Sequence, residues 1–376
     1  MLLPAREGIH AVLSNMRQNS SKCDYIIRKV YTEDIHHEKS KGRYCRSWEI
    51  RKVHARNLAF KIPNAELTAA CSIVPAELEY AREELGVTDV YEDYREMLAR
   101  ADIDAVAIVT TSGEHCWQIA AALDAGKHVF TDKPLGVTVE ECRLAEAAVE
   151  RHPESVFFLG FMRRYDPSYA YAKKKIEEGV IGTPYMVKAA GIDPEALVEG
   201  AIRFAATSGG IFIDMAIHDI DLMRWFLGSD PVEVYAAGAT FKHPEFVEAG
   251  DDETGAAMYK CANGALGIIH VGRTAAHGYH IETEIIGTEG SLRISPVPEK
   301  NLCMIYDKNG AVTECVSGFP ERFAEAYLLE MQEFVDCVAD GKKPEVTVYD
   351  GTKSTQIGFA TTQAWKTGSI VKIEYN

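Results

Sequence analysis

Two side chains suited to acid–base chemistry, Asp214 and His218, stand four residues apart in SGGIFIDMAIHDID. In a helix such residues share one face, and Asp221 follows His218 at i+3 on that face. A carboxylate beside an imidazole fixes the ring and favours its charged form, as a general base needs near neutral pH. The spacing fits equally well an ordinary acidic residue and a partly buried histidine on an amphipathic helix. A metal site of Asp214, His218 and Asp221 is a weaker alternative, because no further pair of ligands is evident.

Lys133 lies in TDKPLG, directly after the strand-like run KHVFT. In open α/β sheets, ligands bind outside the carboxyl ends of the strands, so Lys133 is where a cofactor or substrate would bind. An ordinary surface turn is the commoner setting for such a lysine. The stretch VTTSGEH also ends a strand and begins a helix, so Thr110, Thr111 and His115 are candidates for the same crevice, with a simple helix cap as the alternative.

The elements that position these residues begin at about Val53. Helices are predicted at VHARNLAF, at 75–85 and at EDYREML, and the runs DAVAIVT, KHVFT and FFLGF predict strands separated by helices at EHCWQIAAALDAG and TVEECRLAEAAVERH. This alternation predicts βαβ units in a doubly wound parallel sheet with right-handed crossovers.

After Phe161 the pattern changes to α+β. Helices are predicted at PSYAYAKKKIEEG and near 211–227, followed by strand-like runs with Gly- or Asn-containing turns between them, as in an antiparallel sheet. Two more helices, in the stretches that begin ERFAEAY and DGTKSTQ, enclose the extended PEVTV. The predicted class is therefore α/β, with a doubly wound parallel sheet joined to an α+β domain.

Composition excludes several classes of partner. Asp and Glu outnumber Lys and Arg by 56 to 40, and the net charge of −16 would repel nucleic acid. No stretch approaches the ~18 uninterrupted apolar residues of a membrane span, and MLLPAREGIH lacks a signal-peptide pattern. The nine cysteines include no CxxC pair, which argues against a zinc site or a disulfide framework. We therefore expect a cytoplasmic protein with reduced thiols and no metal.

Three motifs in order resemble those of the Gfo/Idh/MocA oxidoreductases: DKP after a strand, GFMRRYD, and GGIFIDMAIHDID. The resemblance extends from about Val53 to the C-terminus. Within that family, FMRRYDPSYAYAKK, AAGIDP, AHGYHIETEIIGTEG and PEVTVYDG are most similar to the inositol 2-dehydrogenases of inositol catabolism. The resemblance implies a Rossmann domain over 44–158 and, over 159–345, a substrate and oligomerisation domain whose large open, mostly antiparallel sheet often forms tetramer contacts. It leaves a tail over 1–43 and a segment over 346–376 that returns toward the Rossmann domain.

The resemblance also implies roles for single residues. Lys133 matches the lysine of the family's EKP motif, and Asp214 and His218 match its paired helix residues. His218 would take a hydroxyl proton while the carbinol carbon gives a hydride to the nicotinamide, Lys133 would stabilise the alkoxide, and Asp214 would orient the imidazole. The implied substrate pocket contains Met162, Arg163, Asp193, His277 and Tyr279. The implied cofactor site contains Ser72, Thr110, Thr111, His115, Asp132 and Lys133.

One part of the pattern is missing. A dinucleotide fold of this kind begins with a strand that runs into GxGxxG, but no glycine occurs between Arg43 and Gly86. Family members usually read like GLGRLGxxHAxNL where this chain has RSWEIRKVHARNL. If Cys45–Arg51 were encoded TGT AGG TCT TGG GAG ATT AGG, reading one base later would give VGLGRLG. We therefore hypothesise a frameshift that ends near Lys52; codons that yield no glycines in either shifted frame would refute it.

Two functions follow from these observations. The leading prediction is an enzyme that moves a hydride from a ring hydroxyl carbon of inositol, or of a similar cyclitol or sugar, to NAD. The alternatives are a non-catalytic NAD(P)-sensing regulator and an inactive chain, because the glycine loop is absent. Ser72 stands where an acid commonly holds the ribose hydroxyls, so NAD rather than NADP follows only from the resemblance, which also implies a homotetramer.

Overall fold

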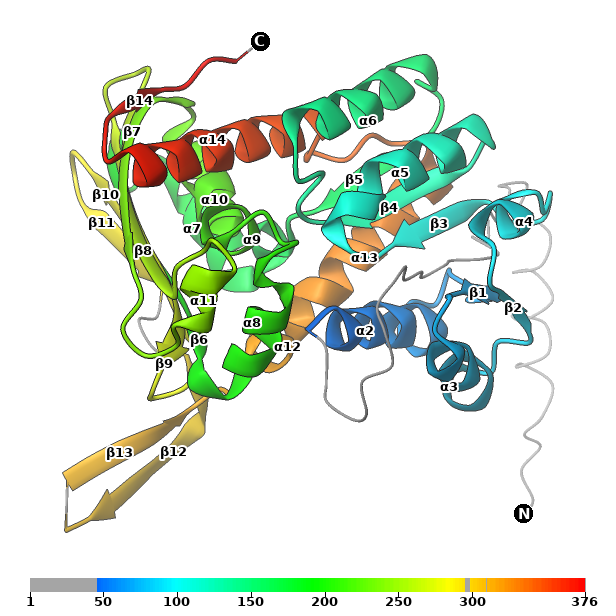
Figure 1. The fold of residues 1–376 in the computed structure, drawn as a ribbon, viewed down its shortest axis with the longest axis horizontal. Helices are drawn as coiled ribbons and strands as arrows, with labels where there is room; N and C mark the ends of the chain where they lie inside the picture. Colours follow the sequence, from blue (N-terminus) through cyan, green and yellow to red (C-terminus); the bar gives the residue numbers. More distant parts are fainter. Residues whose placement is uncertain (1–45, 295–297, 309, 376) are drawn as a thin grey trace, which may run out of the picture.

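The computed structural model describes residues 46–294, 298–308 and 310–375, and its strands divide between parallel sheets and a large mixed sheet (Figure 1). The parallel strands are β1 (Ala69–Cys71), β2 (Asp89–Tyr91), β3 (Ala105–Ile108), β4 (His128–Asp132) and β5 (Phe157–Gly160). The helices that alternate with them are α2 (Arg46–Phe60), α3 (Pro75–Leu85), α4 (Tyr94–Leu98), α5 (His115–Asp124) and α6 (Val139–Arg151). The predicted α/β class is confirmed.

Local sequence explains these elements. Every residue of β3 is buried, as expected for a parallel strand that helices cover on both faces. The helix α3 begins with Pro75 in its first turn and ends at Gly86, whose φ of 73° favours glycine. A capping box of Thr138 and Glu141 begins α6.

The parallel strands form two sheets, one of β1 and β2 and one of β3, β4 and β5, where the sequence predicts one. In the doubly wound strand order, the first strand lies between the second and the fourth. Here β1 and β2 correspond to the second and third strands, and β3–β5 to the fourth to sixth. Because α2 begins at Arg46 and the described residues place no strand before it, the central position of the sheet has no strand within the described part of the chain.

The second sheet has seven strands in the order β11-β10-β6-β9-β8-β7-β14, and only the β6–β9 pair is parallel. Its strands are β6 (Pro184–Pro194), β7 (Pro231–Ala239), β8 (Thr254–Cys261), β9 (Leu266–Ala275), β10 (His280–Gly287), β11 (Ser291–Ile294) and β14 (Val371–Lys372). Buried and more exposed residues alternate along β8 and β10, as expected for a sheet with one packed and one open face. Figure 1 shows helices on one side of this sheet only.

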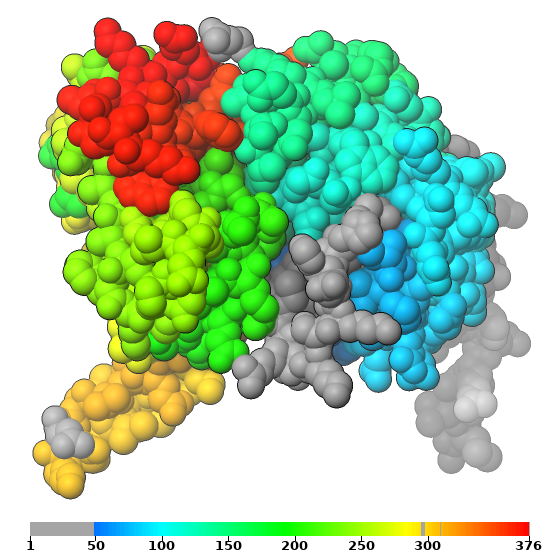
Figure 2. Space-filling model, viewed as in Figure 1, coloured from blue at the N-terminus to red at the C-terminus, as the bar shows by residue number. Residues whose placement is uncertain are grey.

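Two features lie outside these layers. The hairpin of β12 (Glu299–Asp307) and β13 (Gly310–Cys315) projects from the body of the molecule (Figures 1 and 2). The helices α13 (Ala324–Asp340) and α14 (Val348–Thr367) join the two halves, because α13 packs on α2 while α14 packs on both α6 and β7. None of the described helices has the length and apolar character needed to cross a membrane.

The helix predicted near 211–227 is interrupted. The structure has α9 (Ile211–Asp214) and α10 (Ile217–Leu227), with Met215 and Ala216 between them, so the prediction of one continuous helix is wrong. Gly209 and Gly210, with φ of 82° and 85°, turn the chain into α9. As a result, Asp214 is the last residue of one helix and His218 the second residue of the next.

Candidate active site

A cavity lies at the carboxyl ends of β3 and β4, where the first domain meets α9 and α10. Lys133, Asp214 and His218 all line it. Asp214 and His218 are 6% and 8% exposed, so both are buried side chains that still reach the cavity wall. Because these groups come from separate elements, the cavity joins the two motifs that the sequence singled out.

Lys133 is placed by the turn after β4 and by contacts with α9. Its Nζ donates a hydrogen bond to the backbone carbonyl of Asp214 at 2.9 Å and lies 3.8 Å from the Asp214 Oδ1. The Lys133 side chain is 12% exposed, which excludes the ordinary surface turn that the sequence left open. An ammonium group held in a largely buried cavity is suited to stabilise negative charge that develops on a bound oxygen.

The side chains at the end of β3 divide between the cavity and the protein behind it. Thr110 and Thr111 line the cavity, as does Asp132 from the end of β4. Neither Thr111 nor Glu114 caps the following helical turns with its side chain, so a simple helix cap does not explain this segment.

His115 does not line the cavity. Its Nδ1 lies 2.7 Å from the carbonyl oxygen of Pro134 and its Nε2 lies 3.1 Å from that of Thr110, which connects the ends of β3 and β4. Burial lowers the pKa of His115, and the two carbonyl groups oppose that effect. The structure thus places His115 behind the loop that carries Lys133.

The residues expected in the substrate pocket are also divided. Met162 and Tyr279 line the cavity, whereas Arg163, Asp193 and His277 do not. Arg163 is buried in an ion pair with Asp219 at 2.6 Å. His277 is exposed, and its Nε2 lies 3.1 Å from the Nδ1 of His280.

Ser72, which follows β1, does not line this cavity. Its hydroxyl donates a hydrogen bond to Glu77 at 2.8 Å, and Arg51 forms an ion pair with the same carboxylate. Arg51 stands where the family pattern has its third glycine, and its side chain is only 2% exposed. A buried ion pair therefore occupies the position in α2 where the third glycine of a dinucleotide-binding fold lets helix and strand pack closely.

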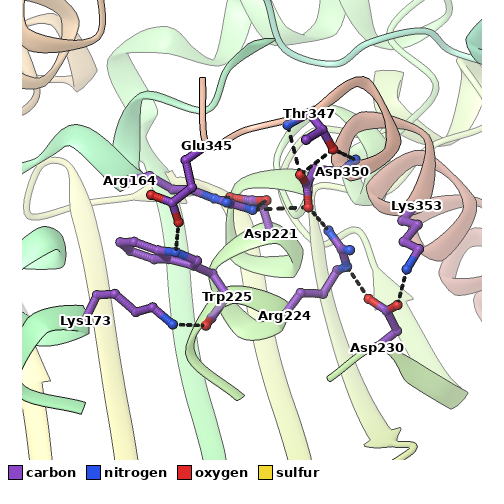
Figure 3. A network of polar contacts seen from close by, with 10 residues as sticks. All are labelled: Arg164, Lys173, Asp221, Arg224, Trp225, Asp230, Glu345, Thr347, Asp350 and Lys353. Carbon is purple, nitrogen blue, oxygen red and sulfur yellow. Dashed lines mark hydrogen bonds and ion pairs between the residues drawn. The ribbon is translucent and has the colours of Figure 1, made fainter. Parts of the chain in front are cut away.

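Asp221 belongs to a separate polar network (Figure 3). The Arg164 guanidinium binds its carboxylate with two hydrogen bonds of 2.8 and 2.6 Å. Arg164 and Arg224 both reach Asp350 at the beginning of α14, and Arg224 also binds Asp230. Figure 3 shows these side chains meeting between α10 and α14, so Asp221 helps to join α10 to the C-terminal segment.

The alternative of a metal site at Asp214, His218 and Asp221 has no support. Among the described residues, no three His, Cys, Asp or Glu side chains are arranged to hold a metal ion. The carboxylate of Asp221 is instead taken up by Arg164, a partner that sequence spacing could not reveal because it lies 57 residues away.

Sequence reasoning missed several cavity residues. Those that also line it are Ile50, Val109, Ser112, Pro134, Gly200, Phe204, Phe319 and Tyr327. Most are apolar or small residues without a chemical signature, and Phe319 and Tyr327 lie in a helical stretch whose apolar residues resemble an ordinary core. Arg273 was also missed: it is buried behind the cavity, 3.2 Å from Asp214.

Two family models match the chain. Residues 49–160 match an oxidoreductase family with an NAD-binding Rossmann fold, and residues 169–293 match the GFO/IDH/MocA C-terminal domain. The first match begins within α2, so it does not include the segment before that helix.

Several similar proteins are named as inositol dehydrogenases. The scyllo-inositol 2-dehydrogenase (NAD(+)) of Bacillus subtilis is 36% identical over 85% of this chain and 92% of its own length. The myo-inositol 2-dehydrogenase of Thermotoga maritima is 31% identical over 86% of this chain and 96% of its own length. The structure of scyllo-inositol dehydrogenase from Lactobacillus casei with bound NAD(H) and scyllo-inositol has a TM-score of 0.85 and 43% identity, and the match covers 92% of this chain and 99% of that one.

Proposed function

Because this chain belongs to the Gfo/Idh/MocA oxidoreductases, we propose that it is an NAD-dependent inositol dehydrogenase that oxidises a ring hydroxyl to a ketone. The observation that carries this proposal is the meeting of Lys133, Asp214 and His218 in one cavity at the carboxyl ends of parallel strands. The three similar proteins described above are named as inositol dehydrogenases, which favours catalysis over the alternative of a non-catalytic sensor.

The three residues divide the work of the reaction. His218 accepts the proton of the substrate hydroxyl, and the Lys133 ammonium stabilises the negative charge that develops on that oxygen. Asp214, beside Lys133, provides the fixed negative charge that balances the cation and orients the neighbouring groups. NAD, when bound, accepts the hydride from the carbinol carbon. Met162 and Tyr279 line the part of the cavity assigned to the cyclitol ring.

The described residues suit the nicotinamide end of a dinucleotide better than its phosphates. Thr110, Thr111 and Asp132 line the cavity at the ends of β3 and β4, which suits the nicotinamide end. At the beginning of α2, Arg51 and Glu77 form a buried ion pair where the phosphate loop of a Rossmann fold has glycine. We assign nicotinamide binding to the cavity. Because residues 46–51 lack these glycines, we expect the chain to bind the dinucleotide phosphates weakly.

A coupled assay tests the proposal. Purified chain is incubated with NAD or NADP and with a panel of myo-inositol, scyllo-inositol and related sugars, and the absorbance of the reduced cofactor is followed. We expect inositol-dependent NADH formation that His218→Asn reduces by about 10²–10⁴-fold in kcat, the usual contribution of general acid–base catalysis. Equal turnover by wild type and His218→Asn would refute the assigned role of His218.

A parallel binding experiment separates an enzyme from a sensor. NADH binding is measured by fluorescence in wild type and in His218→Asn, where the dissociation constant should be similar because His218 acts on the substrate hydroxyl. NADH binding without turnover of any polyol would favour the sensor. Absence of both would identify an inactive chain.

The open face of the seven-stranded sheet supports assembly into a homotetramer. Tyr235, Met258 and Ile268 are exposed there at 44%, 54% and 39%, a concentration of apolar surface that association would bury. The projecting β12–β13 hairpin exposes further apolar side chains, with Leu302 and Tyr306 at 100% and 78%. Light scattering coupled to size-exclusion chromatography should give the mass of four chains, whereas a monomer at micromolar concentration would contradict this assignment.

We further assign the protein to the cytoplasm. The described cysteines form no disulfide, and Cys71, Cys116 and Cys142 are buried thiols. Such thiols are expected where glutathione and thioredoxin keep proteins reduced. Fractionation of the cells that produce the protein, with detection by antibody, tests this location.

A further inference from the structure

Arg273 is a buried cation behind the cavity that the proposed reaction does not use. Along β9, Ile269 and Val271 point into the core and the alternation places Arg273 on the same side, where its side chain is 1% exposed. Between Ile192 and Pro194 of β6 the register shifts by one residue against Gly272 and Ala275 of β9, so the regular pairing of these two strands is interrupted next to Arg273.

A guanidinium is costly to bury unless anions compensate it, and two carboxylates do so here. Its Nη1 donates to the Asp214 Oδ2 at 3.2 Å, and its Nη2 lies 3.6 Å from the Asp251 Oδ2. The Asp251 Oδ1 accepts a hydrogen bond from the backbone N–H of Ile211 at 2.9 Å, which anchors it to the first turn of α9. The Arg273 guanidinium also lies over the ring of Phe246 at 5.5 Å.

Asp214 therefore lies between two cations. Its Oδ2 contacts Arg273 on the core side, and its Oδ1 lies 3.8 Å from the Lys133 Nζ on the cavity side. Arg273 is the closer of the two, and unlike lysine it stays charged at all accessible pH values. Arg273 binds the Asp214 carboxylate through its Nη1, and Asp251 and the ring of Phe246 in turn hold the guanidinium in place.

We propose that Arg273 is a positioning residue, which holds the Asp214 carboxylate toward the core and so limits how closely that carboxylate pairs with Lys133. This inference rests on the role that the proposed function gives to Lys133 and Asp214. Asp251 completes the arrangement, because it fixes Arg273 to the beginning of the helix that ends at Asp214.

Replacing Arg273 by methionine or glutamine removes the charge, and two effects then act on Lys133 in the same direction. A nearby positive charge is lost, and the Asp214 carboxylate becomes able to approach the ammonium more closely. Both favour protonated lysine, so the pKa of Lys133 should rise. The other titratable groups near this pair, Asp132, His115, His218 and Asp251, are present in all variants.

The test measures the titration of Lys133 in the chain itself. Competitive acetylation with acetic anhydride across a range of pH, read on the peptide that contains Lys133 by mass spectrometry, requires neither cofactor nor substrate. We expect the midpoint for Lys133 to rise by roughly one pH unit in Arg273→Met and Arg273→Gln, the usual size for a nearby charge. Arg273→Lys, which keeps the charge, should stay near the wild-type midpoint.

A matched control is Lys174→Met, which removes a cation that is 70% exposed on the surface and should leave the Lys133 midpoint unchanged. Where the wild type turns over inositol, Arg273→Gln should lower kcat more than it changes KM, and Arg273→Lys should recover part of the loss. An unchanged Lys133 midpoint in a folded Arg273→Gln or Arg273→Met would overturn the inference. Loss of folding in both neutral variants, shown by circular dichroism, would also overturn it and make Arg273 a structural residue.

The proposed function and the role of Arg273 can fail independently of each other. If no polyol is oxidised by the wild type, the enzyme assignment fails, while the titration of Lys133 still decides whether Arg273 controls the Asp214–Lys133 pair.

Discussion

The buried ion pair of Arg163 and Asp219 provides a quantitative test of the structure. The guanidinium Nη1 lies 2.6 Å from the Asp219 Oδ1, and the two side chains are 4% and 0% exposed. Burial raises the pKa of Asp219, and the adjacent Arg163 opposes that rise. Removing either partner leaves the other charge buried and unpaired. The carboxylate can lose its charge by taking up a proton, whereas the guanidinium stays charged.

The two single substitutions should therefore differ. Asp219→Asn leaves an arginine that cannot be neutralised, so we expect a loss of about 3–5 kcal/mol in the free energy of unfolding at any pH. In Arg163→Met, Asp219 can be protonated at a cost of about 1.4 kcal/mol for each pH unit above its unfolded pKa of about 3.9. The loss should be roughly 2 kcal/mol at pH 5.5 and should approach the full 3–5 kcal/mol at pH 8.

The sign follows from linkage. In Arg163→Met the folded-state pKa of Asp219 lies above the unfolded value, so the folded chain binds the extra proton and stability falls as the pH rises toward the folded pKa. Urea unfolding followed by circular dichroism at pH 5.5 and pH 8 measures the effect. Equal losses in the two variants, with no dependence on pH, would show that this pair does not carry buried charge.

The same variants test the sequence-based assignment of Arg163 to the substrate pocket. Because Arg163 does not line the cavity and is occupied by Asp219, we expect the KM for inositol to stay nearly constant in folded Arg163→Met. A large increase in KM at a temperature where the variant is folded would instead support a direct role in binding. The double variant Arg163→Met/Asp219→Leu should recover much of the stability, because it removes both charges.

Three further predictions concern other parts of the molecule. Burial, reinforced by Asp132, raises the pKa of Glu330 well above its usual value, so Glu330→Gln should raise the free energy of unfolding by more than about 1 kcal/mol at pH 8 and by less at pH 5, measured by urea unfolding. Gly191→Ala would place a Cβ 2.9 Å from the Asp219 Oδ2 and should cost about 1–3 kcal/mol in the same measurement. Replacing residues 46–51 by GLGRLG should tighten NADH binding by roughly tenfold or more in a fluorescence titration, and unchanged binding would argue against a missing phosphate loop.

Periodicity predicted most of the first half of the fold. The runs at β3, β4 and β5 and the helices between them appear where the sequence places them. The strands β3 and β5 are apolar and fully buried, the middle of β4 is buried, and α6 carries a clear capping signal in Thr138 with Glu141. The division into two parallel sheets was not predicted. Whether β1 and β3 belong to one sheet depends on whether a further strand lies between them. The sequences of β1 and β3 themselves do not determine this.

The site was predicted in part, and the failures have a common cause. Lys133, Asp214 and His218, which all line the cavity, could be picked out of the sequence because each combines a reactive side chain with a motif. Asp221 was expected to share a helical face with His218, but its nearest cation comes from Arg164, 57 residues away. Arg273 was missed for the same reason: in the sequence it is one cation in an apolar strand, and only the sheet brings it to Asp214. Ion pairs between distant elements have no local signal.

The proposed acid–base groups and the segment that should bind the cofactor phosphates can therefore be tested separately. Lys133, Asp214 and His218 depend on the ends of β3 and β4 and on α9 and α10, all of which are complete in the described structure. The positions that the family pattern fills with GLGRLG, residues 46–51, lie at the beginning of α2, which contributes Ile50 to the cavity. If this separation is correct, the printed chain should still bind inositol weakly in calorimetry, and GLGRLG at 46–51 should change NADH affinity while the Lys133 titration stays constant. A Lys133 midpoint that moved with the loop would show that the two halves of the site are coupled.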